Sequence, residues 1–130
     1  MSEHPNVTLV RRLYESKMAP DVIDEIVDPE LVWDITPGFP NGGVYQGWAS
    51  VSEDFFGTLQ PLFASLGSVS EEYLAAGDDH VVVLGHYHAT TAAGAQADAR
   101  FVHVWTVRGG KLTRLRQTAD SHVLQQALAG

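Results

Sequence analysis

Three histidines in the second half of the chain could carry acid–base chemistry or bind a metal ion. His86 and His88 are two residues apart, so on a β-strand both imidazoles would project from the same face. A histidine titrates near neutral pH and can donate or accept a proton. Joined by His103 from a neighbouring strand, they could also form a three-imidazole metal site. No carboxylate is evident to orient such ligands, so we favour histidines that form hydrogen bonds in a pocket, and we expect no metal and no cofactor.

A carboxylate lies in an earlier apolar segment, where Asp34 follows Trp33. Held beside His103 in an apolar cavity, Asp34 could take part in proton transfers that enolise a ketone or open a ring. His86 is the other candidate for moving the proton. The alternation of Leu31 and Trp33 leaves an alternative, in which these residues form the buried face of a strand and Asp34 faces solvent.

The relative positions of the histidines depend on how two long predicted strands pair. These strands cover about residues 80–91 and 97–107, and Gly94-Ala95 between them suits a two-residue hairpin turn. A slip of one residue would reverse every side chain of one strand. The predicted register gives one inward face that contains His86, His88, Phe101, His103 and Trp105.

A second hairpin decides whether polar or cationic side chains join this face. A two-residue loop at Gly109-Gly110 would turn Arg114 and Arg116 inward. A three-residue loop that includes Arg108 would instead turn Gln117 inward. Because burying two unpaired arginines is costly, we predict the three-residue loop and a hydrogen-bonding role for Gln117.

Large aromatic and polar side chains near these strands could contact a planar ligand. For Phe55 and Phe63, on one helix face, a place in the ordinary core is favoured. Asp120 could reach the cavity mouth or cap the last helix. The candidate ligand-binding residues are Tyr14, Trp33, Tyr45, Trp48, Phe56, Leu59, His88, Phe101, Trp105, Gln117 and Asp120.

The elements that would position these residues are predicted to be helices in the first half of the chain and strands in the second. Apolar spacing predicts a helix over about 5–18, a short one from Pro20, and another from Val51 to Phe63, with a strand at 31–35 and a loop at 37–47. Strands follow at 69–76, 80–91, 97–107 and 111–119, before a tail helix. This order predicts an α+β fold, in which a curved antiparallel sheet wraps around the N-terminal helices and leaves a cone-shaped pocket.

The composition indicates which classes of protein and partner the chain fits. The 130 residues include 16 acidic and 8 basic side chains, which give a formal net charge of −8, and 45% are hydrophobic. This balance fits a single globular domain over 1–130 and argues against nucleic-acid or membrane-surface partners. The absence of cysteine excludes disulfides and thiolate chemistry. Met1 to Pro5 show no signal-peptide pattern, so the cytoplasm is the expected location.

Several motifs resemble the SnoaL-like group of the nuclear transport factor 2-like superfamily, which also contains ketosteroid isomerases and polyketide cyclases. They are Trp33-Asp34, Pro37-Gly38, Tyr45-Gln46-Gly47 and the stretch FVHVWTVRGGKLTRLRQTADS. The resemblance covers nearly the whole chain and implies a cystatin-like α+β barrel. It is specific for the fold rather than for one reaction.

The resemblance also implies roles for individual residues. Ketosteroid isomerases use a carboxylate base together with a tyrosine and a protonated aspartic acid that donate hydrogen bonds to the substrate oxygen. Asp34 matches the place of the base, His103 stands where the aspartic acid would be, and Tyr14 lies about one residue from the tyrosine.

We therefore expect a pocket for an apolar, carbonyl-containing small molecule. The protein could be a cofactor-independent acid–base enzyme of isomerase, cyclase or hydrolase type, with Asp34, His103 and His86 as catalytic residues. The alternative is a ligand-binding or dimerisation module without turnover. An apolar outer sheet face containing Tyr87, Val102 and Val104 would pair two copies into a homodimer.

Overall fold

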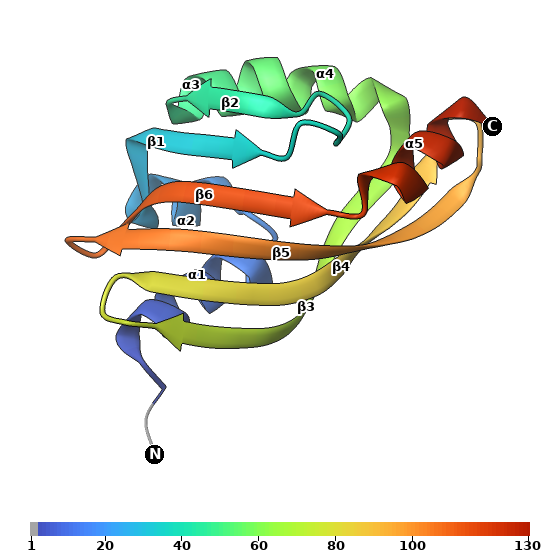
Figure 1. The fold of residues 1–130 in the computed structure, drawn as a ribbon. Coiled ribbons are helices and arrows are strands. Elements are labelled where there is room, and N and C mark those ends of the chain that lie inside the picture. The colour runs from blue at the N-terminus through green and yellow to red at the C-terminus, as the bar shows by residue number, and fades with distance from the viewer. Residues whose placement is uncertain (1–2) are drawn as a thin grey trace.

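A curved sheet with helices against one side forms the fold, in a computed structural model that describes residues 3–130. Met1 and Ser2, part of the segment used to predict the location, lie outside it. The six strands lie in the order β2-β1-β6-β5-β4-β3 and do not close into a barrel (Figure 1). The predicted α+β class and curved sheet are confirmed. The elements are α1 (Pro5–Glu15), α2 (Pro20–Ile26), β1 (Val27–Ile35), β2 (Gly43–Gln46), α3 (Trp48–Ser50), η1 (Val51–Phe56), α4 (Gly57–Leu59), η2 (Gln60–Leu62), β3 (Phe63–Ala76), β4 (His80–Thr91), β5 (Gln96–Arg108), β6 (Lys111–Ala119) and α5 (Ser121–Ala129).

Helix α1 begins as the sequence predicts and ends earlier. Pro5 occupies its first turn, and the His4 imidazole accepts a hydrogen bond from the Asn6 backbone N–H at 3.1 Å. The helix stops at Glu15 because the chain then enters the left-handed region, which replaces the helical turn predicted up to residue 18. Its buried face consists of Val7, Val10 and Leu13.

Residues 48–62 form one helical run of changing pitch. The run begins as α3, passes through the π-helical η1 and α4, and ends in the 3-10 turn η2, where Pro61 prevents its continuation. Upstream, the predicted loop at 37–47 contains the short strand β2, which pairs with β1 at one edge of the sheet.

The sheet is antiparallel except at one pair. β1 runs parallel to β6, although the sequence analysis predicted antiparallel strands throughout. β3 is longer than the predicted 69–76 and is interrupted by two bulges, with Ala64 and Glu71 as the extra residues. Bulges bend a strand and increase its twist, which helps β3 follow the curvature of the sheet.

The core lies between the concave side of the sheet and the helices. Its most deeply buried large side chains include Leu13, Ile26, Leu31, Leu112 and Leu115. Within residues 3–130, no helix is both long enough and apolar enough to cross a bilayer.

Gly85 lies on β4 against the backbone of β3. A Cβ added to Gly85 would lie 2.2 Å from the Val69 carbonyl oxygen and 2.8 Å from Phe101 Cζ. We expect Gly85→Ala to lower the free energy of unfolding by about 1.5 kcal/mol, because the backbone must move to admit the methyl group. Gly67→Ala on β3 is the matched control, since an added Cβ there meets nothing within 4 Å. Equal urea midpoints for the two variants would contradict this account of the bend.

Candidate functional site

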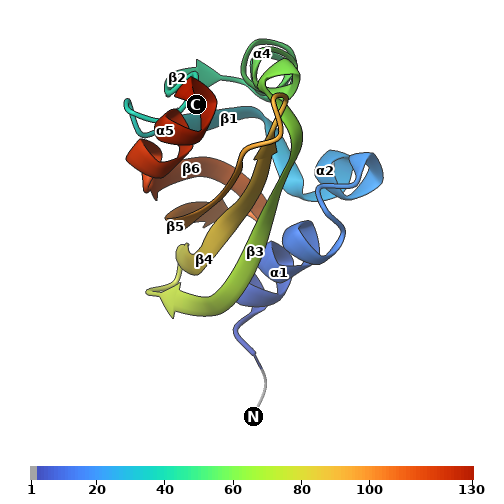
Figure 2. The ribbon, with the colours of Figure 1, turned by 90° about the vertical axis from the view of Figure 1, so that its right-hand side faces the viewer.

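A cavity of about 630 Å³ lies between the concave face of the sheet and the helices. Figure 2 shows the strands curving past α1, with α4 above them. The volume of the cavity is within the range of small-molecule sites. Within residues 3–130 no aspartate or glutamate lines it, and most of its wall is apolar. Its principal side chains are Leu13, Tyr14, Met18, Trp33, Ile35, Phe39, Phe55, Phe56, Leu59, Leu66, Tyr87, His103, Trp105, Leu115 and Gln117.

A chain of hydrogen bonds joins five of these side chains. The His103 imidazole lies between two tyrosines, with Nδ1 at 2.5 Å from Tyr14 Oη and Nε2 at 2.7 Å from Tyr87 Oη. Trp105 Nε1–H donates to Tyr14 Oη at 2.8 Å, and Gln117 Nε2–H donates to Tyr87 Oη at 2.8 Å. Each phenol oxygen therefore already accepts a hydrogen bond from the protein.

Three strands, β4, β5 and β6, and helix α1 bring this network together. His103 faces Gln117 in the β5–β6 ladder and Val83 in the β4–β5 ladder, so all three share the concave face. Tyr14 reaches the same point from the end of α1. The Phe101 ring stacks on the imidazole, with centroids 3.9 Å apart and planes 9° apart. These contacts fix the orientation of the His103 ring.

Burial keeps every member of the network uncharged at neutral pH. Desolvation lowers the pKa of His103 from an ordinary value of 6.5 to about 3, so the imidazole is neutral. Desolvation also raises the pKa of Tyr14 well above its usual value, against a smaller opposite effect of the bond from Trp105. The pKa of Tyr87 is raised by the same cause. Both tyrosines therefore carry their hydroxyl hydrogens.

The number of hydrogens in the network exceeds the number of bonds that need them. Tyr14 and Tyr87 each bring one O–H, and a neutral His103 brings one N–H, while the two tyrosine–histidine contacts use two of these three hydrogens. With the N–H at Nδ1, the Tyr14 hydroxyl is left to donate elsewhere, and with the N–H at Nε2 it is the Tyr87 hydroxyl. Within residues 3–130 neither hydroxyl donates a hydrogen bond to any acceptor other than His103. Because both tyrosines line the cavity, the network offers one O–H donor to its contents.

The structure brings together about half of the residues predicted for the site. The ones that line the cavity as expected are Tyr14, Trp33, Phe56, Leu59, His103, Trp105 and Gln117. The indole N–H of Trp33 is buried without a hydrogen-bond partner within residues 3–130. His88 borders the cavity, but its side chain is 57% exposed and its Nδ1 lies 2.6 Å from an Asp98 carboxylate oxygen.

Two predicted catalytic residues lie on the other face of the sheet. Asp34 contacts Arg114, with 3.5 Å between the carboxylate and the guanidinium, because Trp33 and its alternating neighbours take the inward positions of β1. His86 contacts Glu71 at 2.7 Å. Neither side chain lines the cavity, so the predicted pairing of either residue with His103 is wrong.

The remaining predicted contacts have structural roles. Tyr45 donates to the Asn41 carbonyl oxygen at 2.6 Å, and Trp48 packs against Trp33. Asp120 caps α5 by accepting a hydrogen bond from the Val123 backbone N–H at 3.4 Å. None of these three lines the cavity, and Phe101 contributes only by stacking on His103.

The turn between β4 and β5 explains the misplaced histidines. The loop is Ala92–Gly94, closed by the Thr91 N–H to the Ala95 carbonyl at 2.8 Å, instead of Gly94-Ala95. The pairing is therefore displaced by an odd number of residues, which reverses the faces of β4 relative to β5. Tyr87 points inward in place of its neighbours His86 and His88, so the three histidines do not converge.

The second hairpin turns Gln117 inward, as predicted, but with a different loop from the predicted one. Arg108 pairs with Lys111, so the loop is the two-residue Gly109-Gly110 that the sequence analysis rejected. A bulge with Thr113 as the extra residue then shifts β6 by one position, which turns Gln117 inward.

Several lining residues were not predicted as site residues. Tyr87 could have been found from the alternation Val81, Val83, Tyr87, but Val82 and Leu84 between them are also apolar. Phe39 lies in a Gly/Pro-rich segment without periodicity, and no local signal places it in the cavity wall.

Comparisons with known proteins agree with this architecture. An NTF2-like protein from Burkholderia thailandensis is similar over 98% of both chains, with 25% identity and a TM-score of 0.86. TerC, crystallised with polyporic acid, is similar over 97% of this chain and 99% of its own, with 25% identity and a TM-score of 0.86. A structure described as a SnoaL-like polyketide cyclase from Jannaschia shares the fold over 100% of this chain and 96% of its own, with 21% identity and a TM-score of 0.79.

A search of functionally curated proteins found no significant match. The profile of the SnoaL-like domain matches residues 10–115, which is most of the chain and includes every strand from β1 to β5. The protein therefore belongs to the SnoaL-like domain family.

Proposed function

We propose that the protein binds an apolar small molecule in the cavity and donates a hydrogen bond to an oxygen of that molecule. The proposal rests on the network formed by Tyr14, His103 and Tyr87, which contains three polar hydrogens but needs only two of them for its tyrosine–histidine bonds. A carbonyl or an ionised oxygen satisfies the remaining donor. Accepting hydrogen bonds from Trp105 and Gln117 polarises the two hydroxyls and strengthens them as donors.

Such a donor polarises a carbonyl group, which is one requirement of isomerase and cyclase reactions. Within residues 3–130 no matching base belongs to the hydrogen-bond network: Asp34 and His86 lie on the outer face, His88 borders the cavity paired with Asp98, and the lowered pKa of His103 makes it a weak proton acceptor. The proposal is therefore binding and polarisation of a carbonyl compound. Co-crystallisation of the similar protein TerC with polyporic acid supports ligand binding by a chain of this fold.

A pair of matched ligands tests the proposal. Methyl naphthyl ketone has a carbonyl oxygen, and isopropenylnaphthalene has a methylene group of similar shape in its place. We expect the protein to bind the ketone about 30-fold more tightly, since one made hydrogen bond and one avoided unpaired donor are together worth about 2 kcal/mol. Titration calorimetry gives both constants, and equal affinities would contradict the proposal.

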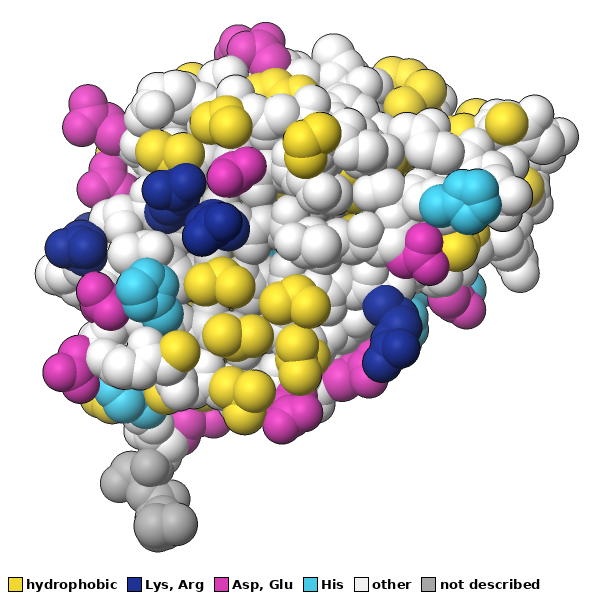
Figure 3. All heavy atoms as spheres, viewed as in Figure 1, with side chains coloured by type: hydrophobic (Ala, Val, Ile, Leu, Met, Phe, Trp, Pro, Cys, Tyr) yellow, Lys and Arg dark blue, Asp and Glu magenta, His cyan; other side chains and the backbone are white. Residues whose placement is uncertain are grey.

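We also propose that the chain, as one SnoaL-like domain over 1–130, works as a cytoplasmic homodimer paired through the outer sheet face. Figure 3 shows apolar side chains gathered on this face over β3, β4 and β5. Leu74 and Val102 are exposed by 42% and 39%. Tyr87, predicted for this face, points into the cavity instead.

Substitution of the outer face tests the dimer. Val102→Glu is expected to shift the mass in sedimentation equilibrium at micromolar concentration from dimer to monomer, because a charge would be buried in the interface. Leu62→Glu, in η2 outside the sheet and 37% exposed, is the matched control and is expected to leave a dimer. A monomeric wild-type protein would contradict this part of the proposal.

A further inference from the structure

The mouth of the cavity is bordered by exposed residues of two segments. Among the lining residues, Lys17 lies in the turn after α1, and Ser65, Gly67, Ser68 and Val69 lie on β3. Lys17 is the only lysine or arginine that lines the cavity within residues 3–130, and no carboxylate does. In a chain of net charge −8, this border is locally cationic.

The backbone at Lys17 is in a conformation that usually requires glycine. The Lys17 N–H bonds to the Tyr14 carbonyl and the Met18 N–H to the Leu13 carbonyl, both at 3.0 Å, which is the bonding pattern of a Schellman motif. Lys17 and Met18 have φ angles of 55° and 58°. A side chain with a Cβ is unfavourable at both positions, and both residues line the cavity. Strain of this kind is frequently found beside ligand sites.

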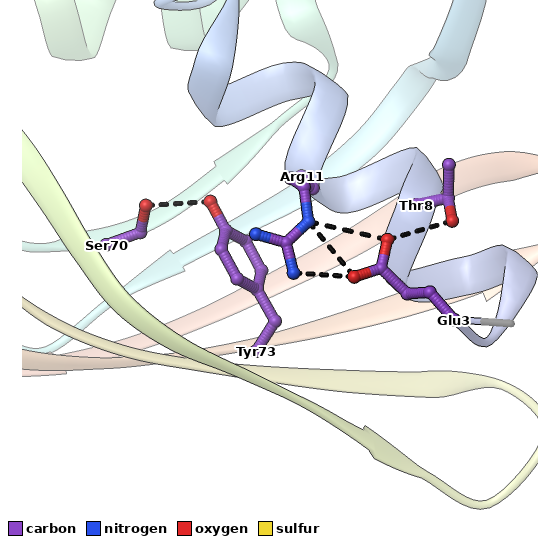
Figure 4. Close-up of polar contacts among 5 residues, drawn as sticks. All are labelled: Glu3, Thr8, Arg11, Ser70 and Tyr73. Carbon is purple, nitrogen blue, oxygen red and sulfur yellow. Dashed lines mark hydrogen bonds and ion pairs between the residues drawn. The ribbon is translucent and has the colours of Figure 1, made fainter. Parts of the chain in front are cut away.

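The Lys17 ammonium makes no hydrogen bond or ion pair within residues 3–130. Arg11, six residues earlier and on α1, is by contrast fully engaged. Figure 4 shows its guanidinium over the Tyr73 ring, with Cζ 4.3 Å from the centroid, and bonded to the Glu3 carboxylate at 2.5 Å. Glu3 in turn accepts a bond from the Thr8 hydroxyl at 3.0 Å. The cation nearest to the cavity is thus left without a partner, while its neighbour is neutralised.

Tyr73 also connects the ion pair of Arg11 and Glu3 to the donor network. Its ring packs edge-on against Tyr14 with centroids 5.7 Å apart, and its hydroxyl donates to Ser70 Oγ at 2.7 Å. Helix α1 therefore places Tyr14 in the wall of the cavity, and the turn that follows it places Lys17 at the border. A ligand bound by Tyr14 therefore lies in the cavity that Lys17 borders.

We infer that Lys17 binds an acidic group of the ligand at the cavity mouth, so that the ligand class is an apolar carbonyl compound with a carboxylate or similar anion at its far end. This inference rests on the proposed function, because it assumes that the oxygen acceptor occupies the donor network. An anion at the border would meet the unpaired ammonium and no opposing carboxylate.

Two ketones that differ only by a carboxylate test the inference. Methyl naphthyl ketone is compared with acetylnaphthoate, in which the ring far from the ketone carries the anion. In low salt we expect wild-type protein to bind acetylnaphthoate about four-fold more tightly. Lys17→Gln should remove this preference and leave the affinity for the neutral ketone unchanged. Arg116→Gln, an equal loss of charge at a residue of β6 outside the cavity lining, should retain it.

A glycine variant separates the charge from the backbone. Lys17→Gly is expected to lose the preference for acetylnaphthoate and to raise Tm by about 3 °C, because glycine fills the left-handed position without strain. A preference that survives Lys17→Gln, or a Tm lowered by Lys17→Gly, would overturn the inference. If both ketones bind and only the preference is missing, the proposed function stands and the inference fails. If neither ketone binds the wild type, both fail.

Discussion

Acidification is expected to destabilise the protein through His103 alone by as much as about 1.4 kcal/mol for each pH unit between 6.5 and 3. The unfolded chain binds a proton at this histidine near pH 6.5, whereas the folded protein excludes it until about pH 3. Between these values the unfolded state holds more protons, so the free energy of unfolding falls as the pH falls. Above pH 6.5 the histidine is neutral in both states and adds no pH dependence.

Urea unfolding at several pH values measures this effect, and His103→Gln is the comparison. The variant lacks the titrating group and keeps a polar side chain between the tyrosines, so its stability should fall less steeply below pH 6.5. Carboxylates that titrate in the same range are common to both proteins and cancel in the difference. Parallel curves for wild type and variant would show that the folded protein accepts the proton, and so contradict a neutral, solvent-excluded His103.

Removing both phenol hydroxyls is expected to cost about 30-fold in affinity for methyl naphthyl ketone. In the double variant Tyr14→Phe, Tyr87→Phe no hydroxyl donor remains, and a ketone in the wild-type position would be separated by the lost oxygens from the N–H groups of His103, Trp105 and Gln117 that bonded to them. Each single variant should lose less, because the tautomer of His103 can change and leave the other hydroxyl free. The affinity for isopropenylnaphthalene should stay within about two-fold of the wild type, since the cavity keeps its shape.

The matched control for these variants is Tyr45→Phe. Tyr45 donates to a backbone carbonyl outside the cavity, so its variant should bind both naphthalenes as the wild type does. Thermal unfolding followed by circular dichroism establishes that each variant is folded. A folded double variant that retains the preference for the ketone would mean that the oxygen is bound elsewhere.

Much of the fold could be predicted because its elements carry strong local signals. Apolar spacing located α1 and α2, and glycines marked the connections between the strands of the second half, although not the exact residues of the β4–β5 turn. Strand pairing between distant segments carries no such signal, which is why the parallel pairing of β1 with β6 was missed. The end of α1 was also missed, since the residues in the left-handed turn are lysine and methionine instead of glycine.

The site was predicted less well because it depends on the parity of the register. His103, Trp105 and Gln117 belong to strands whose relative faces were correct, and all three line the cavity. The neighbouring strand β4 has apolar residues on both faces, with Val81 and Val83 inward and Val82 outward, so alternation could not fix its orientation. A turn centred at a different residue therefore exchanged His86 and His88 for Tyr87, and changed the expected acid–base pair into a tyrosine–histidine–tyrosine network.

The most direct test of this network is the carbonyl stretching frequency of bound methyl naphthyl ketone, labelled with carbon-13 at the carbonyl to separate its band from the amide bands. A hydrogen bond from the network should move the band to lower frequency than in an apolar solvent, and the double variant Tyr14→Phe, Tyr87→Phe should return it toward the apolar value. A bound ketone whose band already lies at the apolar frequency in the wild-type protein would contradict the claim that the cavity presents a spare hydroxyl donor.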